Sequence, residues 1–421
     1  MLRCLPTLVL ACAIAPGAPA RAQDAALGAE LEPLLAYART RNPEFAALQA
    51  EADASHERIV PAGALPDPKF GVELRDITRA GEQNPTLSPG RTGSTRYLLL
   101  QEIPWFGKRD LRREVAELEA EGARERARGN WAEVAGRIKI NFAQLYYLYR
   151  SERLTRQILD LLGRLERIAL ARYAGGLAAQ QDVIRAQVEQ TSLRSELITL
   201  ETERHHAHTR LNTLLARPGD APLQEPARLR PLPPPAALDY AALDERARAR
   251  NPQLFADEAK LRAAEKTREL TYRNRYPDFA FGVAPVQYQN SIREWELIVE
   301  LNIPLQQSSR RAQEREAESL LAAARARKQA STSQVGAELA ESLSAIEAAR
   351  RTENLLAGSL LPQAELTFQA ALAGYETGKV DFATLLDAQR QIRLARQNQL
   401  KAQVDARIRL AEVERLLGDD L

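Results

Sequence analysis

The chain carries one pattern of motifs twice, and this internal duplication limits its fold more than any other feature of the sequence. The paired motifs occur in the same order in both halves, and their offset stays between 200 and 211 residues. They are Arg41-Asn42-Pro43 with Arg250-Asn251-Pro252, Phe70-Gly71-Val72 with Phe281-Gly282-Val283, Ile103-Pro104 with Ile303-Pro304, and Ala186-Gln187 with Ala388-Gln389. The repetition predicts two copies of one supersecondary unit.

Each copy has the same predicted order of elements, which is a helix, two strands and two long helices. We expect the first copy over residues 23–217, with a helix over 27–60, a β-hairpin over 65–104 and long helices over 108–173 and 178–216. We expect the second over 237–421, with a helix over 237–272, a hairpin over 277–304 and long helices over 305–374 and 380–417. A proline-rich linker over 218–236 joins them. Asn42-Pro43 and Asn251-Pro252 should break the first helices or start new ones at the proline, and Pro362 should kink its helix.

The N-terminus has the composition of a secretory leader. An apolar stretch from Leu5 to Ala15 precedes Ala20-Arg21-Ala22, a small-residue cleavage pattern, so we expect a signal peptide over 1–22. Lipidation at Cys12 is the alternative. Cleavage after residue 22 would remove both cysteines, Cys4 and Cys12, and would exclude disulfides and cysteine-ligated metals. It would leave 56 basic and 56 acidic residues, a balance that gives no sign of a nucleic-acid partner.

The predicted strands alternate between polar and apolar side chains. In the first strand, Lys69, Gly71, Glu73 and Arg75 alternate with Phe70, Val72 and Leu74; in the last, Glu294, Glu296, Glu300 and Asn302 alternate with Trp295, Leu297, Val299 and Leu301. The strand over 96–103 is less regular, because Gln101 falls on its apolar side. A surface hairpin can show such alternation, but four such strands in a secreted chain favour a transmembrane barrel.

Four strands per chain are too few to form a closed barrel without strands from other chains. Beyond the leader, no apolar run reaches the roughly 18 residues that span a bilayer as a helix, so a membrane crossing would need a closed β-barrel. Four strands cannot close a barrel, and unpaired edge groups in lipid cost several kcal/mol each. The edges must therefore pair with other copies. Three copies would supply twelve strands, although the sequence alone permits two or four.

The long helical stretches are rich in Ala, Leu, Glu, Arg and Gln, which are good helix formers. A helix of about 65 residues is roughly 100 Å long, which a globular domain of this size does not need. Apolar residues recur at spacings of three and four, as in Leu154, Ile158, Leu161, Leu165 and Ile168. This spacing is typical of a coiled-coil seam. The helices therefore suit the wall of a tunnel.

Two helix-turn segments carry a family resemblance. Tyr173-Ala174-Gly175-Gly176-Leu177 and Tyr375-Glu376-Thr377-Gly378-Lys379 each precede a polar turn and a new helix. They resemble the paired periplasmic tips of the TolC-type outer-membrane efflux factors, a likeness that covers residues 30–418. The stretch from Gln101 to Arg109 resembles the barrel-to-helix junction of the CusC/CzcC-like metal-efflux branch.

The resemblance implies a mostly α-helical fold with a transmembrane β-barrel portion. Four strands per protomer would form a twelve-stranded barrel in a homotrimer, continued by a long α-helical barrel in the periplasm. The protein would lie in the outer membrane of a Gram-negative envelope, surrounded by its lipid. It would be a passive gated duct of a tripartite efflux system, exporting small molecules or heavy-metal cations. Its partners would be a periplasmic adaptor protein and an inner-membrane pump of the RND type.

The resemblance also implies a gate at the tips. In the family, an acidic residue six past the first tip glycine bonds a tyrosine three before the second, and Asp182 and Tyr375 occupy these positions. Acidic rings six and nine past the second glycine narrow the pore; Asp387 matches one, and Thr384 replaces the other. The adaptor would contact Gly176, Leu177, Gly378 and Lys379.

Motifs of enzyme chemistry are weak, and we assign no catalytic, cofactor-binding or metal-ligating residue. His56-Glu57 lacks the second histidine of a zinc protease motif. Glu201, His205 and His208 share one helix face and could hold a metal, but a solvated face is the commoner explanation. Two other functions stay open. A periplasmic adaptor or coiled-coil scaffold would be soluble without detergent, and a secretion-type channel of the same architecture would export a protein.

Overall fold

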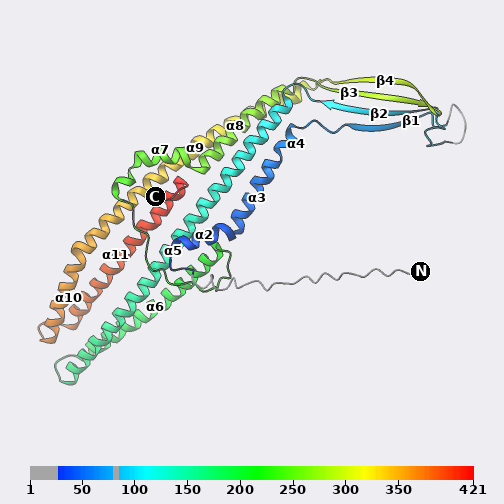
Figure 1. Cartoon of the computed structure of the whole chain (residues 1–421). Helices are drawn as coiled ribbons and strands as arrows, with labels where there is room; N and C mark the ends of the chain where they lie inside the picture. Colours follow the sequence, from blue (N-terminus) through cyan, green and yellow to red (C-terminus); the bar gives the residue numbers. More distant parts are fainter. Residues whose placement is uncertain (1–26, 79–84) are drawn as a thin grey trace, which may run out of the picture. The chain divides into compact units, whose positions relative to one another are not determined.

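The computed structural model describes residues 27–78 and 85–421. The expected signal peptide over 1–22 and the alternative lipidation at Cys12 lie outside the described residues, as do residues 79–84 of the first inter-strand loop. Long helices and one four-stranded sheet make up most of these described residues (Figure 1). Over the two described ranges, none of the helices is both long and apolar enough to cross a bilayer.

Both halves of the chain place shorter helices first, then two strands, then long helices. The first half contains α2 (Leu31–Arg41), α3 (Pro43–Glu57), α4 (Ile59–Gly63), β1 (Lys69–Arg75), β2 (Ser94–Ile103), α5 (Lys108–Ala174) and α6 (Gln180–Leu214). The second contains α7 (Tyr240–Arg250), α8 (Pro252–Arg273), β3 (Asp278–Tyr288), β4 (Ser291–Asn302), α9 (Gln307–Leu355), α10 (Leu361–Glu376) and α11 (Phe382–Leu417). A 3₁₀ turn at Pro235–Leu238 precedes α7, and a π-helical turn at Leu356–Leu360 joins α9 to α10.

The repeated Asn-Pro motifs start new helices. Asn42 lies at the N-cap of α3, where its side chain accepts a hydrogen bond from the N–H of Phe45 at 3.0 Å. Asn251 caps α8 in the same way, bonding the N–H of Leu254 at 3.0 Å. The proline that follows each asparagine needs no hydrogen-bond partner at the first helical position, and its fixed φ suits the helix. The duplicated motif is therefore a duplicated helix start.

The stretch expected as one helix over 305–374 is interrupted. The π-helical turn at Leu356–Leu360 separates α9 from α10, and Pro362 is the second residue of α10. A proline has no N–H to give to the carbonyl four residues earlier, here that of Gly358, so the regular ladder cannot run through this point. The interruption takes the form of a π turn.

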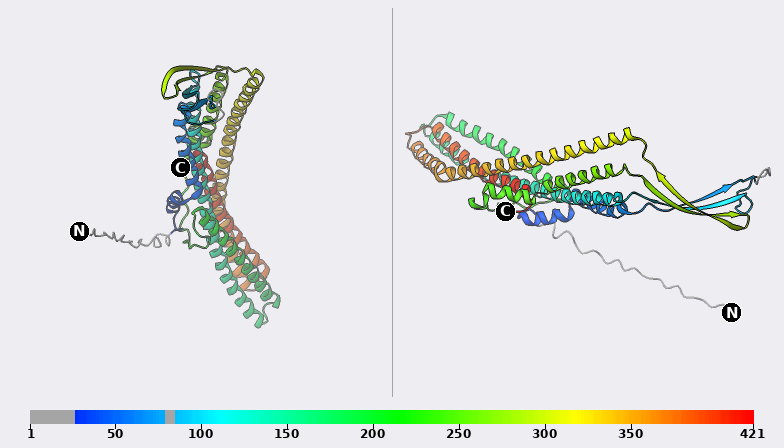
Figure 2. Two further views of the ribbon diagram at one scale, coloured as in Figure 1. Left: turned by 90° about the vertical axis from the view of Figure 1, so that its right-hand side faces the viewer. Right: turned by 90° about the horizontal axis from the view of Figure 1, so that it is seen from above.

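The four strands form one antiparallel sheet in the order β1-β2-β3-β4, with β1 and β4 at its edges. Figure 2 shows the strands twisting about one another. The register aligns one row of apolar side chains across the sheet, because Phe70 pairs with Leu99, Leu99 with Val283, and Val283 with Leu297. All four are exposed, from 44% for Val283 to 76% for Leu297. One face of the sheet is therefore both apolar and exposed.

Gln101 interrupts this face without leaving its amide unpaired. It pairs in register with Phe281 of β3. Its side-chain amide donates to the carbonyls of Pro66 at 2.7 Å and Glu102 at 2.9 Å. A polar side chain can lie in an apolar face when its hydrogen bonds are satisfied locally. The irregular position in the sequence is therefore compatible with a regular strand.

The described chain divides into two compact units, and the division cuts across the two sequence copies. The tip unit comprises residues 27–38, 141–230 and 358–404, and the sheet unit comprises residues 39–140, 231–357 and 405–421. In the tip unit, α5, α6, α10 and α11 share one core that includes Leu162, Leu193, Phe368 and Leu385. In the sheet unit, α7, α8, α9 and α11 share another, which includes Leu339 and Val413. Each unit thus takes elements from both copies.

The cap at Asn251 generates a stability prediction. Besides capping α8, its side-chain amide donates to the carbonyl of Leu416 at 2.8 Å, and the residue is buried. We expect Asn251→Ala to lower the free energy of unfolding by about 2 kcal/mol, because it removes a cap and a buried hydrogen bond. Asp239 is the matched control, since this exposed residue only caps α7. Asp239→Ala should cost about 1 kcal/mol. Thermal unfolding in detergent checks both, and equal losses would contradict the double role of Asn251.

Candidate functional site

The candidate site lies where the two helical hairpins of the tip unit end. The first tip (residues 175–179) joins α5 to α6, and the second tip (residues 377–381) joins α10 to α11. Gly176 has a φ of 70° and Gly378 a φ of 77°, a left-handed conformation that favours glycine. The N–H of Leu177 then reaches back to the carbonyl of Arg172 at 2.7 Å, and that of Lys379 to Gly374 at 2.8 Å. Both helices thus end in the same way.

The structure brings together Asp182 and Tyr375, the two residues predicted to bond between the tips. The hydroxyl of Tyr375 lies 3.4 Å from Oδ2 of Asp182. Tyr375 is only 3% exposed, and its ring packs against Phe382 at a centroid distance of 5.2 Å. Burial and the nearby Asp182 carboxylate raise the pKa of Tyr375 to about 12. The hydroxyl therefore keeps its proton at neutral pH and can donate it to the carboxylate.

The duplication does not produce a second pair of this kind. Tyr173 is the counterpart of Tyr375 in the first tip, but it is 44% exposed. Thr384 replaces the acidic residue in the second copy. Its hydroxyl and its N–H both bond Oδ1 of Asp381, at 2.6 and 2.9 Å. The second tip therefore uses its aspartate to cap α11.

Asp387, the predicted ring residue, lies on an exposed part of α11. Its side chain is 67% exposed and meets Arg390 at 3.4 Å. Arg390 also binds Glu189 of α6 at 2.6 Å, and this ion pair raises the pKa of Arg390. Glu189 is buried, so its pairing with Arg390 offsets a large desolvation cost. The role of Asp387 in a ring stays a prediction.

A second ion pair continues this connection between α6 and α11, and sequence reasoning missed both pairs. Glu196 binds Arg393 at 3.0 Å and the amide of Gln397 at 2.9 Å. Glu189 and Glu196 are seven residues apart, which places them on one face of α6. The signal that the sequence offered was this pair of acidic residues on one face of α6, together with two basic residues three positions apart in α11.

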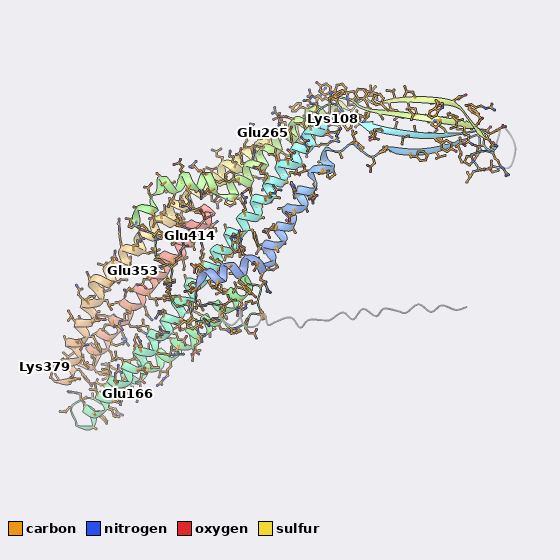
Figure 3. All side chains as sticks on the ribbon, viewed as in Figure 1. Lys108, Glu166, Glu265, Glu353, Lys379 and Glu414 are labelled. Atoms are coloured by element: carbon orange, nitrogen blue, oxygen red, sulfur yellow. The ribbon has the colours of Figure 1, made fainter. Side chains whose placement is uncertain are left out.

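Glu166 ties α5 to α6 close to the first tip, where Figure 3 labels it. Its carboxylate accepts hydrogen bonds from the amides of Gln190 at 2.6 Å and Gln187 at 2.8 Å. These two bonds hold the pKa of Glu166 below its usual value. The ionised carboxylate therefore stabilises the first hairpin.

The residues predicted to contact an adaptor lie at the ends of the hairpins. Leu177 is 70% exposed in the first tip. Lys379 is exposed in the second tip, and Figure 3 shows it at the end of the hairpin formed by α10 and α11. Gly176 and Gly378 form the turns themselves. An exposed leucine at one hairpin end and an exposed lysine at the other are suited to a protein partner, but the contact itself stays a prediction.

The histidines on α6 are not arranged as a metal site. His208 forms a hydrogen bond through Nε2 with the hydroxyl of Tyr149 at 3.0 Å. The pKa of His208 is lowered mainly by burial, and to a lesser extent by the charges of Arg204 and His205. Among the residues that the structure describes, no three His, Cys, Asp or Glu side chains are placed to share a metal ion.

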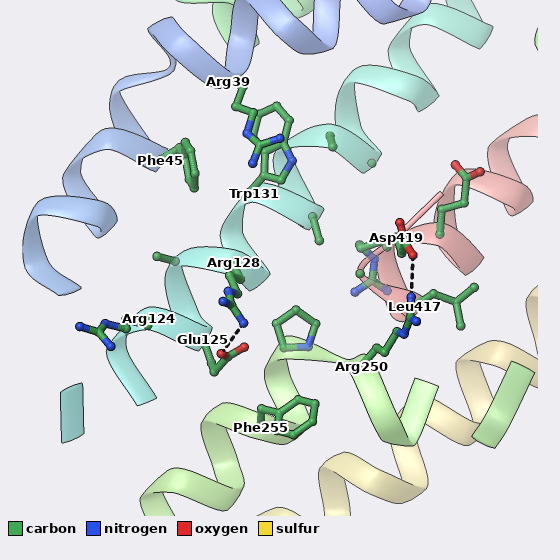
Figure 4. A pocket seen from close by; sticks show the side chains of 18 of the residues that line it. Arg39, Phe45, Arg124, Glu125, Arg128, Trp131, Arg250, Phe255, Leu417 and Asp419 are labelled. Carbon is green, nitrogen blue, oxygen red and sulfur yellow. Dashed lines mark hydrogen bonds and ion pairs between the residues drawn. The ribbon is translucent and has the colours of Figure 1, made fainter. Parts of the chain in front are cut away.

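The sheet unit contains a groove of about 1180 Å³ that the sequence did not predict (Figure 4). Aromatic side chains line one part of it, with Phe45 packed against Trp131 at 5.4 Å and Arg39 over the Trp131 ring at 5.7 Å. Ion pairs line the rest, including Arg250 with Asp419 at 2.9 Å. Six acidic and six basic residues line the groove, so it shows no preference for a ligand of either charge.

Comparisons with known proteins identify the family. The model of the outer membrane efflux protein family matches residues 34–217 and 243–419. The cobalt-zinc-cadmium resistance protein CzcC of Cupriavidus metallidurans is 23% identical over 411 residues, which cover 95% of this chain and 92% of CzcC. The structure of VceC of Vibrio cholerae matches with a TM-score of 0.80 at 17% identity, covering 93% of this chain and 96% of VceC. CusC matches with a TM-score of 0.74 at 16% identity, covering 92% of each chain.

The chain belongs to the outer membrane efflux protein family. Its fold is that of a TolC-like outer-membrane channel protomer, as predicted from the sequence. It is an efflux channel of the outer membrane that extends into the periplasm, and it is not an enzyme. The matched segments correspond to the two sequence copies and leave out the residues between them.

Glu166 generates a prediction for the pH dependence of stability. Its folded-state pKa is lowered, so its contribution is present above pH ~4.5 and is lost as the pH falls through the folded-state pKa. We expect Glu166→Gln to reduce the drop in melting temperature between pH 7 and pH 4, because the variant has no carboxylate to protonate. Scanning calorimetry in detergent measures this. Glu201→Gln, on the exposed part of α6, is the control. An unchanged pH dependence in Glu166→Gln would show that its bonds to Gln187 and Gln190 are unimportant.

Proposed function

We propose that three copies of this chain form a passive, gated channel that exports heavy-metal cations from a periplasmic adaptor and an inner-membrane pump of the RND type. The observation that carries the proposal is the sheet. It has two edge strands, β1 and β4, and an exposed apolar row that crosses all four strands. Such a sheet is stable in lipid only when its edges pair with other strands. Three sheets would close a barrel of twelve strands, within the range of known barrels.

The tip unit supplies the gate in this proposal. The Tyr375–Asp182 bond joins the two hairpins of one protomer. The ion pairs of Glu189 and Glu196 join the same hairpins further along. Opening the tips would require these contacts to break, while the sheet could stay closed as a barrel. Energy for export would come from the pump, since the chain itself is a duct.

Two observations support a cationic substrate. CzcC, named for resistance to cobalt, zinc and cadmium, aligns with 95% of this chain. In a trimer, three exposed Asp387 side chains around the pore would favour cations over anions. Small organic molecules are the second candidate, and their export would need no charged ring. A protein substrate, as in a secretion channel, has no specific observation in its favour.

The gate generates a prediction for conductance. We expect Tyr375→Phe to raise the mean conductance in planar bilayers, because it removes the hydroxyl that bonds Asp182. A hydrogen bond of about 1 kcal/mol corresponds to a shift of roughly fivefold in the opening equilibrium of each protomer. Asp182→Ala should act in the same direction. Tyr173→Phe, its exposed counterpart, is the matched control and should have no effect. If Tyr375→Phe and Asp182→Ala both conduct like the unmodified protein, the gate assignment is wrong.

The substrate generates a prediction for growth. Deleting the gene should lower the tolerated concentrations of zinc, cobalt and cadmium salts, because the cations would lose their exit through the outer membrane. Tolerance to organic dyes and detergents should stay the same. Complementation with the intact gene should restore the metal tolerance. Sensitivity to organic toxins without sensitivity to metals would reject the cationic substrate and favour the second candidate.

A further inference from the structure

We propose that Arg172 is a positioning residue of the gate, which fastens the two tips of one protomer together and holds Tyr375 against Asp182. The inference rests on the gate in the proposed function and adds a residue that sequence reasoning did not single out. Arg172 lies in the last turn of α5, and all of its partners named below belong to the tip unit.

The guanidinium of Arg172 bonds one carbonyl in the first tip and one at the end of α10, just before the second tip. Its Nη1 donates to the carbonyl of Glu376, the last residue of α10, at 2.5 Å. Its Nη2 lies 3.4 Å from the carbonyl of Leu177 in the first tip. Carbonyls in the last turn of a helix lack partners within the helix, so a cation is a favourable donor for them. One side chain thereby joins the ends of α5 and α10.

The same guanidinium packs on the ring of the gate tyrosine. Its central carbon lies 5.1 Å from the centroid of the Tyr375 ring. Phe382 packs on that ring as well, at 5.2 Å. A stacked guanidinium attracts the electron-rich ring face and restricts its rotation. The ring is therefore fixed by packing in the orientation that brings its hydroxyl to Asp182.

Gly378 of the second tip leaves room for the guanidinium of Arg172. A Cβ atom on Gly378 would lie 3.3 Å from Nη2 of Arg172, which is tighter than ordinary contact. In the second copy, Gly374 occupies the place of Arg172, and a Cβ there would lie 2.6 Å from the side chain of Val380. The second tip therefore has no arginine of its own at this position. Only the first copy therefore supplies an arginine at this position, and that arginine binds the second copy.

A lysine could not make the same set of contacts. The planar guanidinium presents several donors in a fixed fork and can stack on a ring, whereas an ammonium is a compact point charge. Nε of Arg172 is buried without a hydrogen bond, which is unfavourable. The hydrogen bonds of the two terminal nitrogens to the carbonyls offset this loss. Shape, in addition to charge, is thus what the site requires.

The test compares Arg172→Gln and Arg172→Lys with the unmodified channel in planar bilayers. Both variants lose the fork, so both should raise the opening equilibrium on the order of tenfold per protomer, as expected for bonds from a charged donor. Only Arg172→Gln changes the charge, so only Arg172→Gln should shift the reversal potential toward cations. Arg164→Gln, an exposed arginine two turns earlier on α5, is the control for charge and should leave the conductance unchanged.

A second experiment measures how firmly the two tips are held together, independently of channel conductance. Spin labels at the exposed positions Ala174 and Lys379 report the distance between the tips. Arg172→Gln and Arg172→Lys should broaden this distance distribution, and Arg164→Gln should not. The double variant Arg172→Gln/Tyr375→Phe should open less than the product of the two single effects, because both act on the same bond.

The outcomes separate this inference from the proposed gate. If Tyr375→Phe opens the channel but Arg172→Lys behaves like the unmodified protein in both readouts, the gate stands and the role of Arg172 is wrong. If Arg172→Gln broadens the distances while Tyr375→Phe and Asp182→Ala leave conductance unchanged, Arg172 fastens the tips but the Tyr–Asp gate is wrong. Unchanged distances in both Arg172 variants would overturn the inference.

Discussion

Backbone hydrogen bonding at the edges of the sheet is the constraint on which the rest of the protein depends. β1 and β4 each have one neighbour in the sheet order, and the face that they share is apolar and exposed. In lipid, unpaired backbone groups cost several kcal/mol each, so the strands cannot remain as one open sheet. The proposed association with other copies would remove this cost and would close the sheets into a channel. The long helices can then serve as the periplasmic continuation of that channel.

The duplication explains why one protomer supplies both sides of the proposed gate. Each copy supplies a hairpin with a glycine turn, and the four helices share a single core in the tip unit. The two copies differ in the side chains that the proposed gate uses. Tyr375 is buried and bonded while Tyr173 is exposed, and Arg172 faces the second tip while Gly374 takes its place in the other copy. Equivalent folds with different side chains allow one hairpin to hold the other.

Periodicity, motifs and turn chemistry made much of the fold predictable from the sequence. The four strands, their alternation and the long helices follow from residue patterns at short range, and the Asn-Pro motifs follow from the chemistry of helix starts. The Tyr375–Asp182 contact was available only through the family resemblance, because these residues are 193 positions apart. The sequence predicted a kink at Pro362 but not that it would be a π turn, because a proline shows only that the regular pattern of helix hydrogen bonds is interrupted. The hydrogen bonds of Arg172 could not be predicted, because their acceptors are backbone carbonyls, which leave no mark on the sequence.

The most direct test of the account is the mass of the protein purified from the outer membrane, measured by native mass spectrometry after release from detergent. If the edge strands pair between three copies, as proposed, the complex has three times the mass of the mature chain and stays intact until the sheet is denatured. A protein that stays monomeric, and that remains in solution when detergent is withdrawn, would contradict it. In that case the apolar face of the sheet would need another explanation.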